Sequence, residues 1–332
     1  MPVSYRAFVV NKVDGEFSSG VTTLEEADLP PGEVTVNVEW SSVNFKDGLA
    51  SAANSAVIRK YPMVPGIDLA GTVIESTDTR YTAGQPVIVI GYETGVSHPG
   101  GFAQKARVPA NWVSPTPAGL TTKEAMALGT AGFTAAMSVE AIQKHGITPA
   151  SGPVLVTGAT GGVGSTAIAM LSNLGYTIAA STGKEAEHEY LKSLGATEIL
   201  TREEVSAEST RPMESERWAA VVDPVGGSTC AYALRTTKRE GIVALSGNTG
   251  GFPVATTVLP FILRGITLAG IESVQYPIAE RIRLWHRCAT DLKPRGLLDS
   301  IAHETNLDGL SDALTQILGG QIRGRVLVNT QG

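Results

Sequence analysis

A short glycine-rich stretch, Gly158 to Gly164 within PVLVTGATGGVGSTAIAML, has the residue types and spacing of a phosphate-binding turn. An apolar, strand-like run precedes it and a helical pattern follows it. Glycine is needed in such a turn because φ must be positive there and because a side chain would block a pyrophosphate. The helix beginning near Gly162 would offer free N–H groups and the positive end of its dipole to that phosphate. The pattern predicts a dinucleotide-binding βαβ unit, the alternative being a turn that is merely tight. The expected contacts are Thr160, Gly161, Gly162, Val163 and Gly164.

The end of the next predicted strand indicates which dinucleotide binds. A site for NAD places Asp or Glu about twenty residues after the glycines, where the acid binds the ribose 2′-hydroxyl. Residues 180–184 instead read ASTGK, with no acid before Glu185. Hydroxyls and cations suit a 2′-phosphate, which an Asp would repel. The sequence therefore predicts NADPH; for Lys184 taken alone, the alternative is a solvated surface lysine. The expected contacts on this side are Ser181, Thr182, Gly183, Lys184, Arg202 and Leu245.

The elements that carry these residues change character along the chain. Up to about Pro117, short strands separated by Gly- and Pro-containing turns indicate a β-rich, barrel-like unit. From about Thr121, apolar strands alternate with helices, which is typical of a parallel sheet with helices on both faces. The tail after about Pro294 offers one helix and one final strand, so we assign it to the first unit. We expect an α/β protein with a discontinuous β-rich catalytic domain (1–122 and 296–332) and a Rossmann domain (123–295).

Composition limits the partners and the compartment. The 332 residues are 42% apolar and 17% charged, with a net charge of −6 and no basic stripe, which argues against a nucleic-acid partner. We expect neither a signal peptide nor a membrane-spanning helix. The two cysteines form no CxxC pair, so a reducing compartment, the cytoplasm, is predicted.

Several motifs together resemble a known family. SSVNFKD, YPMVPGIDLAGTV, LGTAGFTAAM and TGATGGVGSTA are similar to the medium-chain dehydrogenase/reductase superfamily, within its zinc-free quinone-oxidoreductase-like branch. The similarity is greatest to the acrylyl-CoA reductases (NADPH) and continues through QIRGRVLV near the C-terminus. This resemblance implies a GroES-like first domain, a homodimer paired at the edge strand ITLAGIES, and reduction of acrylyl-CoA with NADPH.

The resemblance also bears on metal. Zinc-dependent relatives have Cys where this chain has Asn44, Gly-His-Glu where it has GID at 66–68, and another Cys near Thr130. Isoleucine cannot bind a metal, and a catalytic zinc needs about three Cys, His or carboxylate ligands. We therefore expect no metal.

The resemblance places Ser41–Asp47 beside the nicotinamide, with Phe45 against the cofactor. Asn44 would donate to the substrate carbonyl, and Asp47 would orient Asn44 or the substrate. The alternative is plain helix capping, because Asn and Asp are both good N-caps. Arg323 is the third candidate, as a cation for the acyl-CoA or else a surface charge, with Arg325 as the neighbour to test in parallel.

Two other functions stay open. One is a quinone or enone reductase that uses the same hydride transfer on a free acceptor. The other is a nucleotide-binding protein without turnover, like crystallin-type relatives. The expected partner of the favoured enzyme is a small acyl-CoA, with no nucleic acid and no membrane.

Overall fold

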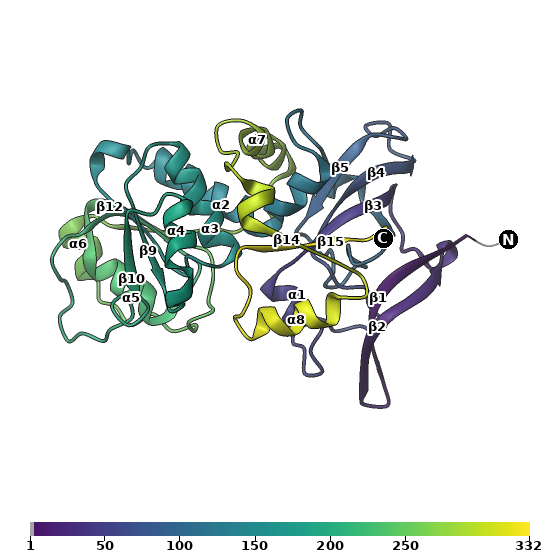
Figure 1. Cartoon of the computed structure of the whole chain (residues 1–332), viewed down its shortest axis with the longest axis horizontal. Helices are drawn as coiled ribbons and strands as arrows, with labels where there is room; N and C mark the ends of the chain where they lie inside the picture. The colour runs from purple at the N-terminus through teal and green to yellow at the C-terminus, as the bar shows by residue number, and fades with distance from the viewer. Residues whose placement is uncertain (1–2) are drawn as a thin grey trace. The chain divides into compact units, whose positions relative to one another are not determined.

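The computed structural model describes residues 3–332 and divides the chain into two compact units (Figure 1). Unit 1 comprises the chain up to Thr130 together with Val274–Ala289 and Gly296–Gly332, and unit 2 comprises Ala131–Ser273 and Thr290–Arg295. The α/β fold with a separate β-rich part is as predicted. The boundaries differ from the expected 122/123 and 295/296, because 123–130 and 274–289 belong to unit 1.

The assignment of residues 274–289 to unit 1 has a clear physical cause. Helix α7 (Ile278–Ala289) carries Arg281, whose side chain is fully buried in unit 1. Arg281 Nη1 donates to the carbonyl oxygen of Ile90 at 3.0 Å, and its guanidinium lies 4.7 Å from the ring centre of Tyr92. The segment PIAERIRLWHRCATDL predicts the helix, but the local pattern does not show these contacts to residues almost two hundred positions earlier.

Unit 1 is built on a seven-stranded, mostly antiparallel sheet in which β14, β15, β3, β4, β5 and β7 follow one another and β6 also pairs with β3. In β3, Val34, Val36 and Val38 alternate into the core, as a half-buried strand requires. The strands are β3 (Val34–Val43), β4 (Asp68–Ser76), β5 (Pro86–Ile90), β6 (Lys105–Val108), β7 (Ser114–Pro115), β14 (Ala302–Asn306) and β15 (Arg325–Asn329). The sequence predicted β15 but not β14.

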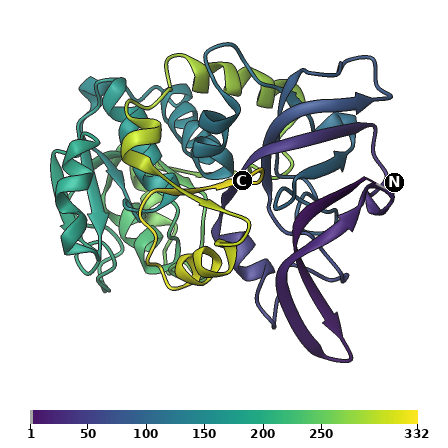
Figure 2. The same cartoon turned by 45° about the vertical axis from the view of Figure 1, so that its right-hand side comes forward.

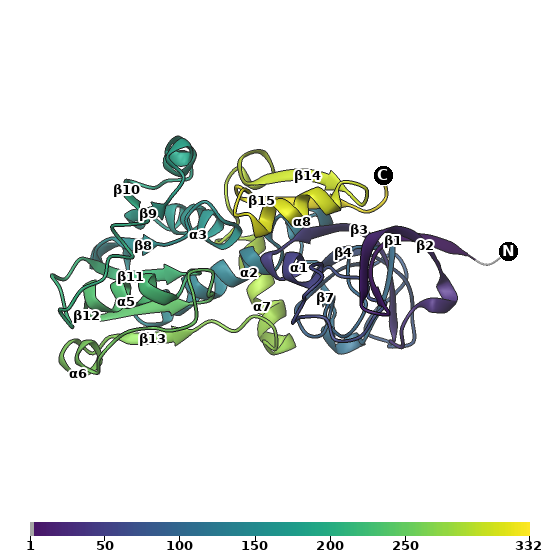
Figure 3. The same cartoon turned by 90° about the horizontal axis from the view of Figure 1, so that it is seen from below.

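A hairpin and two further helices also belong to this unit. Strands β1 (Ser4–Val13) and β2 (Glu16–Glu25) form a separate antiparallel hairpin (Figure 2). Helices α1 (Phe45–Ala50) and α8 (Leu310–Leu318) lie side by side (Figures 1 and 3). A Cβ on Gly48 of α1 would stand 2.8 Å from Leu318 Cγ, so glycine permits their close approach.

Unit 2 is a six-stranded parallel sheet in the order β10-β9-β8-β11-β12-β13. This order reverses direction between β8 and β11, which is the switch point at whose carboxyl edge ligands bind in doubly wound folds. The strands are β8 (Val154–Val156), β9 (Ile178–Thr182), β10 (Glu198–Thr201), β11 (Trp218–Asp223), β12 (Thr237–Leu245) and β13 (Thr267–Gly270). The helices are α3 (Gly162–Asn173), α4 (His188–Ser193), α5 (Gly227–Thr236) and α6 (Leu259–Arg264).

The sequence TTKEAMALGTAGFTAAMSVEAIQK predicts one continuous helix, but α2 (Thr122–Lys144) is not regular along its whole length. Gly129 has φ 53° and ψ −158°, so the helix breaks there. Among the helices of residues 3–332, α2 is the one long and apolar enough to pass for a membrane-spanning helix, but 83% of its most apolar window is buried inside the protein. That burial is typical of a core helix.

Candidate active site

The glycine-rich turn of unit 2 connects β8 to α3. Gly158 has φ 52°, in the left-handed region, and a Cβ on Gly164 would stand 2.5 Å from the Gly158 carbonyl oxygen. Both positions therefore need glycine. Gly161 is the N-cap of α3, which runs for 12 residues, so the open N-terminal turn of this helix follows directly. These features leave the bare backbone and the helix dipole that a pyrophosphate requires. The predicted contacts here are the buried Thr160 and Gly164 and the half-buried Gly161, Gly162 and Val163.

Two cations follow the carboxyl ends of the neighbouring strands β9 and β10. Arg202 lies against Gly183: its guanidinium carbon is 3.0 Å from the position that a Gly183 Cβ would take. Burial lowers the pKa of Lys184; Glu187 opposes this shift and Arg202 adds to it. Thr182 Oγ1 accepts a hydrogen bond from the Lys184 N–H at 3.0 Å. The structure thus brings the predicted 2′-phosphate residues together.

Ser181 and Leu245, which were also predicted to contact the cofactor, are less exposed than Arg202. Ser181 is buried and donates from Oγ to the carbonyl oxygen of Thr201 at 3.3 Å. Leu245 ends β12 and is half-buried.

In unit 1, Asn44 and Asp47 form the N-terminal cap of α1. Asp47 Oδ2 accepts from the Asn44 backbone N–H at 2.8 Å, and the two residues make a reciprocal capping box. Asp47 Oδ1 accepts from the Ile67 N–H at 2.9 Å. Both side chains are buried, Asn44 with 8% of its surface exposed and Asp47 with none. The helix-capping alternative raised by the sequence is therefore present in the structure.

Asn44 also belongs to a larger buried polar cluster. Its amide nitrogen donates to Asp68 Oδ2 at 2.8 Å and contacts Asp47 Oδ2 at 3.2 Å and the Ser42 carbonyl oxygen at 3.3 Å. Its amide oxygen accepts from Arg325 Nη1 at 3.1 Å. The Asn44 amide is thus fully engaged inside the protein.

Asp68 and Arg325 form the centre of this cluster. Their side chains are 0% and 2% exposed, and Arg325 Nη2 lies 3.4 Å from Asp68 Oδ2. Asp68 also accepts from Ser42 Oγ at 2.7 Å and from the Thr130 N–H and hydroxyl at 2.9 and 2.5 Å. Asp68 and Thr130 carried no sequence signal of a site beyond their alignment with metal-binding positions of zinc-dependent relatives, and Ser42 carried none beyond its place in the Ser41–Asp47 segment.

The break in α2 at Gly129 leaves the space that the side chains of this cluster occupy. A Cβ on Gly129 would stand 2.4 Å from Asp68 Oδ2, 2.5 Å from Arg325 Nη2 and 2.6 Å from Ser42 Oγ. Glycine is needed there both for its positive φ and for this space. The break also frees the Thr130 N–H to donate to Asp68 instead of continuing the helix.

Burial sets the charge states in the cluster. Burial, and then the charge of Asp68, raise the pKa of Asp47 to about 7, against the hydrogen bonds from Ile67 and Asn44. Burial also lowers the pKa of Arg325, opposed by the charges of Asp68 and Asp47. Among the predicted catalytic residues, Asn44 and Asp47 lie together, while the arginine of the cluster is Arg325. Arg323 is half-buried, and Phe45, with 38% of its surface exposed, is the more open side chain at the start of α1.

The residues at the zinc positions of relatives do not fit zinc. They are an amide, an aliphatic side chain, a hydroxyl and a carboxylate already bonded to a guanidinium. Within residues 3–332, no three or more His, Cys, Asp and Glu side chains are grouped as ligands.

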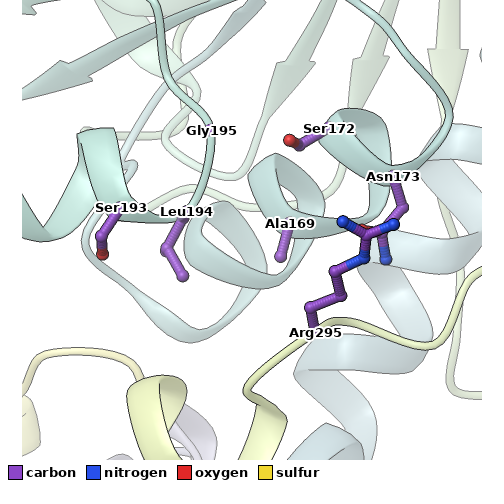
Figure 4. Close-up of a pocket in the computed structure, with 7 residues that line it drawn as sticks. All are labelled: Ala169, Ser172, Asn173, Ser193, Leu194, Gly195 and Arg295. Atoms are coloured by element: carbon purple, nitrogen blue, oxygen red, sulfur yellow. The ribbon is translucent and has the colours of Figure 1, made fainter.

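Two cavities in unit 2 lie away from all of these residues. The smaller, of about 210 Å³, lies at the C-terminal ends of α3 and α4, with Asn173, Ser193 and Arg295 in its lining (Figure 4). The larger, of about 520 Å³, lies between the ends of α2 and α6, with Lys238, Glu240 and Gly265 in its lining. Neither cavity has a predicted site residue in its lining.

Comparison with known proteins identifies the family. Residues 30–118 match the alcohol dehydrogenase GroES-like domain, and residues 162–287 match the zinc-binding dehydrogenase family. The chain is 49% identical over 327 residues to acrylyl-CoA reductase AcuI of Ruegeria pomeroyi, covering 98% of this chain and 99% of that protein.

Solved structures agree with this assignment. The yhdH oxidoreductase of Salmonella enterica in complex with NADP has a TM-score of 0.95 and 47% identity, covering 98% of this chain and 100% of that one. The Bacillus subtilis protein yhfP with NAD bound has a TM-score of 0.96 and 45% identity, covering 99% and 100%. The GroES-like domain, the parallel Rossmann sheet and these full-length relatives lead to one conclusion: the chain belongs to the medium-chain dehydrogenase/reductase superfamily and is an oxidoreductase.

Proposed function

We propose that this chain reduces the C=C bond of acrylyl-CoA to give propanoyl-CoA, with NADPH as the reductant and without a metal. The observation that carries the proposal is the 49% identity, over nearly the whole chain, to a protein named acrylyl-CoA reductase. The cations beside Gly183 and the NADP-bound relative support the choice of NADPH. One acrylyl-CoA, one NADPH and one proton give one propanoyl-CoA and one NADP⁺.

NADPH supplies a hydride, which the β-carbon of the acyl group accepts. The residues of unit 2 that would hold this cofactor fall into two groups. Backbone N–H groups of the glycine-rich turn and of the first turn of α3 would bind the pyrophosphate. The 180–184 segment and Arg202 would bind the 2′-phosphate. The proposed contacts are Thr160, Gly161, Gly162, Val163, Gly164, Ser181, Thr182, Gly183, Lys184, Arg202 and Leu245.

Unit 1 is proposed to hold the acyl-CoA. Negative charge develops on the thioester oxygen, and the resulting enolate takes up a proton at the α-carbon. Because the Asn44 amide is fully bonded inside the cluster, we propose that Asn44 and Asp47 position the first turn of α1. Phe45 and Arg323 are the proposed contacts with cofactor and acyl-CoA.

The test is to follow NADPH absorbance with purified protein and acrylyl-CoA, with NADH and free acrylate as parallel controls. Rapid oxidation of NADPH with the CoA ester, and little with free acrylate, is expected. Equal rates with acrylyl-CoA and a simple enone would refute CoA specificity, and equal rates with NADH and NADPH would refute the choice of cofactor.

A quinone or enone reductase is the second candidate. The observation that favours it is the 45% identity to a Bacillus subtilis protein named as a putative quinone oxidoreductase. Turnover of quinones without turnover of the CoA ester would select this function. Tight NADPH binding with no turnover of any acceptor would select a non-catalytic protein.

Replacing Arg202 with Ala is expected to weaken NADPH binding by about tenfold to a hundredfold and to leave NADH binding nearly unchanged, because one charge-assisted hydrogen bond to phosphate is lost. Fluorescence titration with both cofactors measures this. Arg211→Ala, at an exposed arginine of the same unit, is the control. An equal loss for NADH and NADPH would place Arg202 outside the 2′-phosphate site.

We also propose a homodimer formed through unit 2. Strand β13 is an edge strand, and an unpaired edge invites pairing with another chain. Residues 252–268 expose Phe252, Val258, Ile262, Leu263 and Leu268. Light scattering is expected to give twice the chain mass of 34.6 kDa. Ile262→Asp should shift the mass toward one chain, whereas Ile74→Asp, at an exposed apolar residue of unit 1, should not. A wild-type mass of one chain would refute the dimer.

The cytoplasm is the proposed compartment. Cys230 and Cys288 are both buried and not joined in a disulfide, which suits a reducing environment. Cell fractionation tests this location directly.

A further inference from the structure

Asp223 is a buried carboxylate that the proposed chemistry does not use. It is the last residue of β11, at the carboxyl edge of the unit 2 sheet, and none of its surface is exposed. Its strand pairs directly with β8, the strand that leads into the glycine-rich turn. A buried carboxylate is costly unless several donors compensate it. The hydrogen-bond donors around Asp223 therefore show which segments of the chain this carboxylate holds together.

These donors come from both sides of the strand pair. Thr157, which immediately precedes Gly158, donates from Oγ1 to Asp223 Oδ1 at 2.6 Å. The backbone N–H groups of Val225 and Gly226 donate to the same oxygen at 2.9 and 3.2 Å. Burial raises the pKa of Asp223 and these hydrogen bonds lower it, as does one from the Cys230 thiol. One carboxylate thus ties the end of β8 to the turn that follows β11.

That second turn packs on the first. A Cβ on Gly158 would stand 3.0 Å from Val225 Cγ2 and 3.5 Å from Pro224 Cγ. The Val225 carbonyl oxygen in turn accepts from the Gly250 N–H at 2.8 Å. The side chains of Val225 and Pro224 therefore form a wall against the glycine whose left-handed conformation starts the phosphate-binding turn.

We propose that Asp223 is a positioning residue for the cofactor. Its bond to Thr157 and its bonds to the Val225–Gly226 turn hold the glycine-rich turn in its binding conformation before NADPH arrives. Binding then costs less ordering than it would for a loose turn. This inference rests on the proposed NADPH-dependent function.

Thr157→Val is the most conservative test because it removes the hydroxyl and keeps the shape. We expect NADPH affinity, measured by fluorescence titration of the whole protein, to fall by about tenfold, the factor for losing one hydrogen bond to a charged group. The KM for NADPH should rise in parallel, while kcat at saturating NADPH and the KM for the acyl-CoA stay near wild type. Asp223→Asn should weaken binding at least as much, and the double variant should be less than additive because both changes break one bond.

Thr236→Val is the matched control. Thr236 is a buried threonine of the same unit, the last residue of α5, and its Oγ1 donates to the Tyr232 carbonyl oxygen of the same helix at 2.8 Å. It should alter stability to a similar degree without changing NADPH affinity. Wild-type NADPH affinity in Thr157→Val and Asp223→Asn would overturn the inference and leave the proposed function intact. If Thr236→Val weakened NADPH binding as much as Thr157→Val does, general destabilisation would explain the effect, and the inference would also be overturned. A wild-type protein that binds no NADPH would refute the proposed function itself.

Discussion

Replacing Arg325 with Met is expected to lower the free energy of unfolding by about 3–5 kcal/mol, the usual cost of leaving a buried charge without its partner. The guanidinium lies against Asp68 and also donates to the Val43 carbonyl oxygen at 3.0 Å and to Ser42 Oγ at 2.7 Å. Methionine fills part of the volume but offers no donor. Urea unfolding at neutral pH measures the loss.

The matched control is the pair Arg6–Asp308, which has the same chemistry at the surface, with side chains 46% and 61% exposed. Arg6→Met should cost less than about 1 kcal/mol because water screens an exposed pair. Adding Asp68→Asn to Arg325→Met should cost less than the sum of the two single changes, since it removes the unpaired charge. If Arg325→Met costs no more than Arg6→Met, the cluster does not stabilise the fold through this ion pair.

The second large effect is a pH dependence set by Asp47. Its pKa is raised to about 7 in the folded protein, against about 3.9 in an unfolded chain. Between these values the folded state keeps a proton that the unfolded state has lost, so the stability contribution of Asp47 falls as pH rises. The loss is about 3 kcal/mol between about pH 5 and about pH 8, and it levels off above the folded pKa.

Asp47→Asn isolates this contribution because the amide does not titrate. The variant carries a constant cost, since its NH2 group must face the N–H donor of either Asn44 or Ile67. The quantity to follow is therefore the change with pH in the stability difference between wild type and variant. Asp78→Asn is the control: Arg80 lowers the pKa of this half-buried carboxyl to about 2, so its titration lies below the measured range. A wild-type-minus-Asp47→Asn difference that stays flat with pH would show that Asp47 is ionised throughout.

The features that the sequence predicted are those encoded within a few neighbouring residues. The turn from Gly158 to Gly164 could be recognised because its strand, its glycines and its helix are consecutive. The cap formed by Asn44 and Asp47 is equally local, with partners three positions apart. Both needed no knowledge of the rest of the chain.

The buried cluster could not be predicted in this way. Arg325 reaches Ser42 across 283 positions and Asp68 across 257. Arg323 and Arg325 lie two positions apart, and nothing in the local sequence shows that Arg325 is the buried one. Its burial follows from strand pairing between β15 and β3. The break in α2 was missed for a related reason: a lone glycine is tolerated inside a helical pattern, and only the groups packed against Gly129 reveal why the helix stops there.

The space at Gly129 also limits what protein engineers can build into this fold. Installing zinc ligands at positions 44, 67 and 130 would place a divalent cation next to the Arg325 guanidinium, which already occupies the Asp68 carboxylate. The two cations would repel each other in a region that excludes water. A designed metalloenzyme on this scaffold must therefore first replace Arg325 by a neutral side chain. That side chain must be short enough not to clash with the backbone at Gly129.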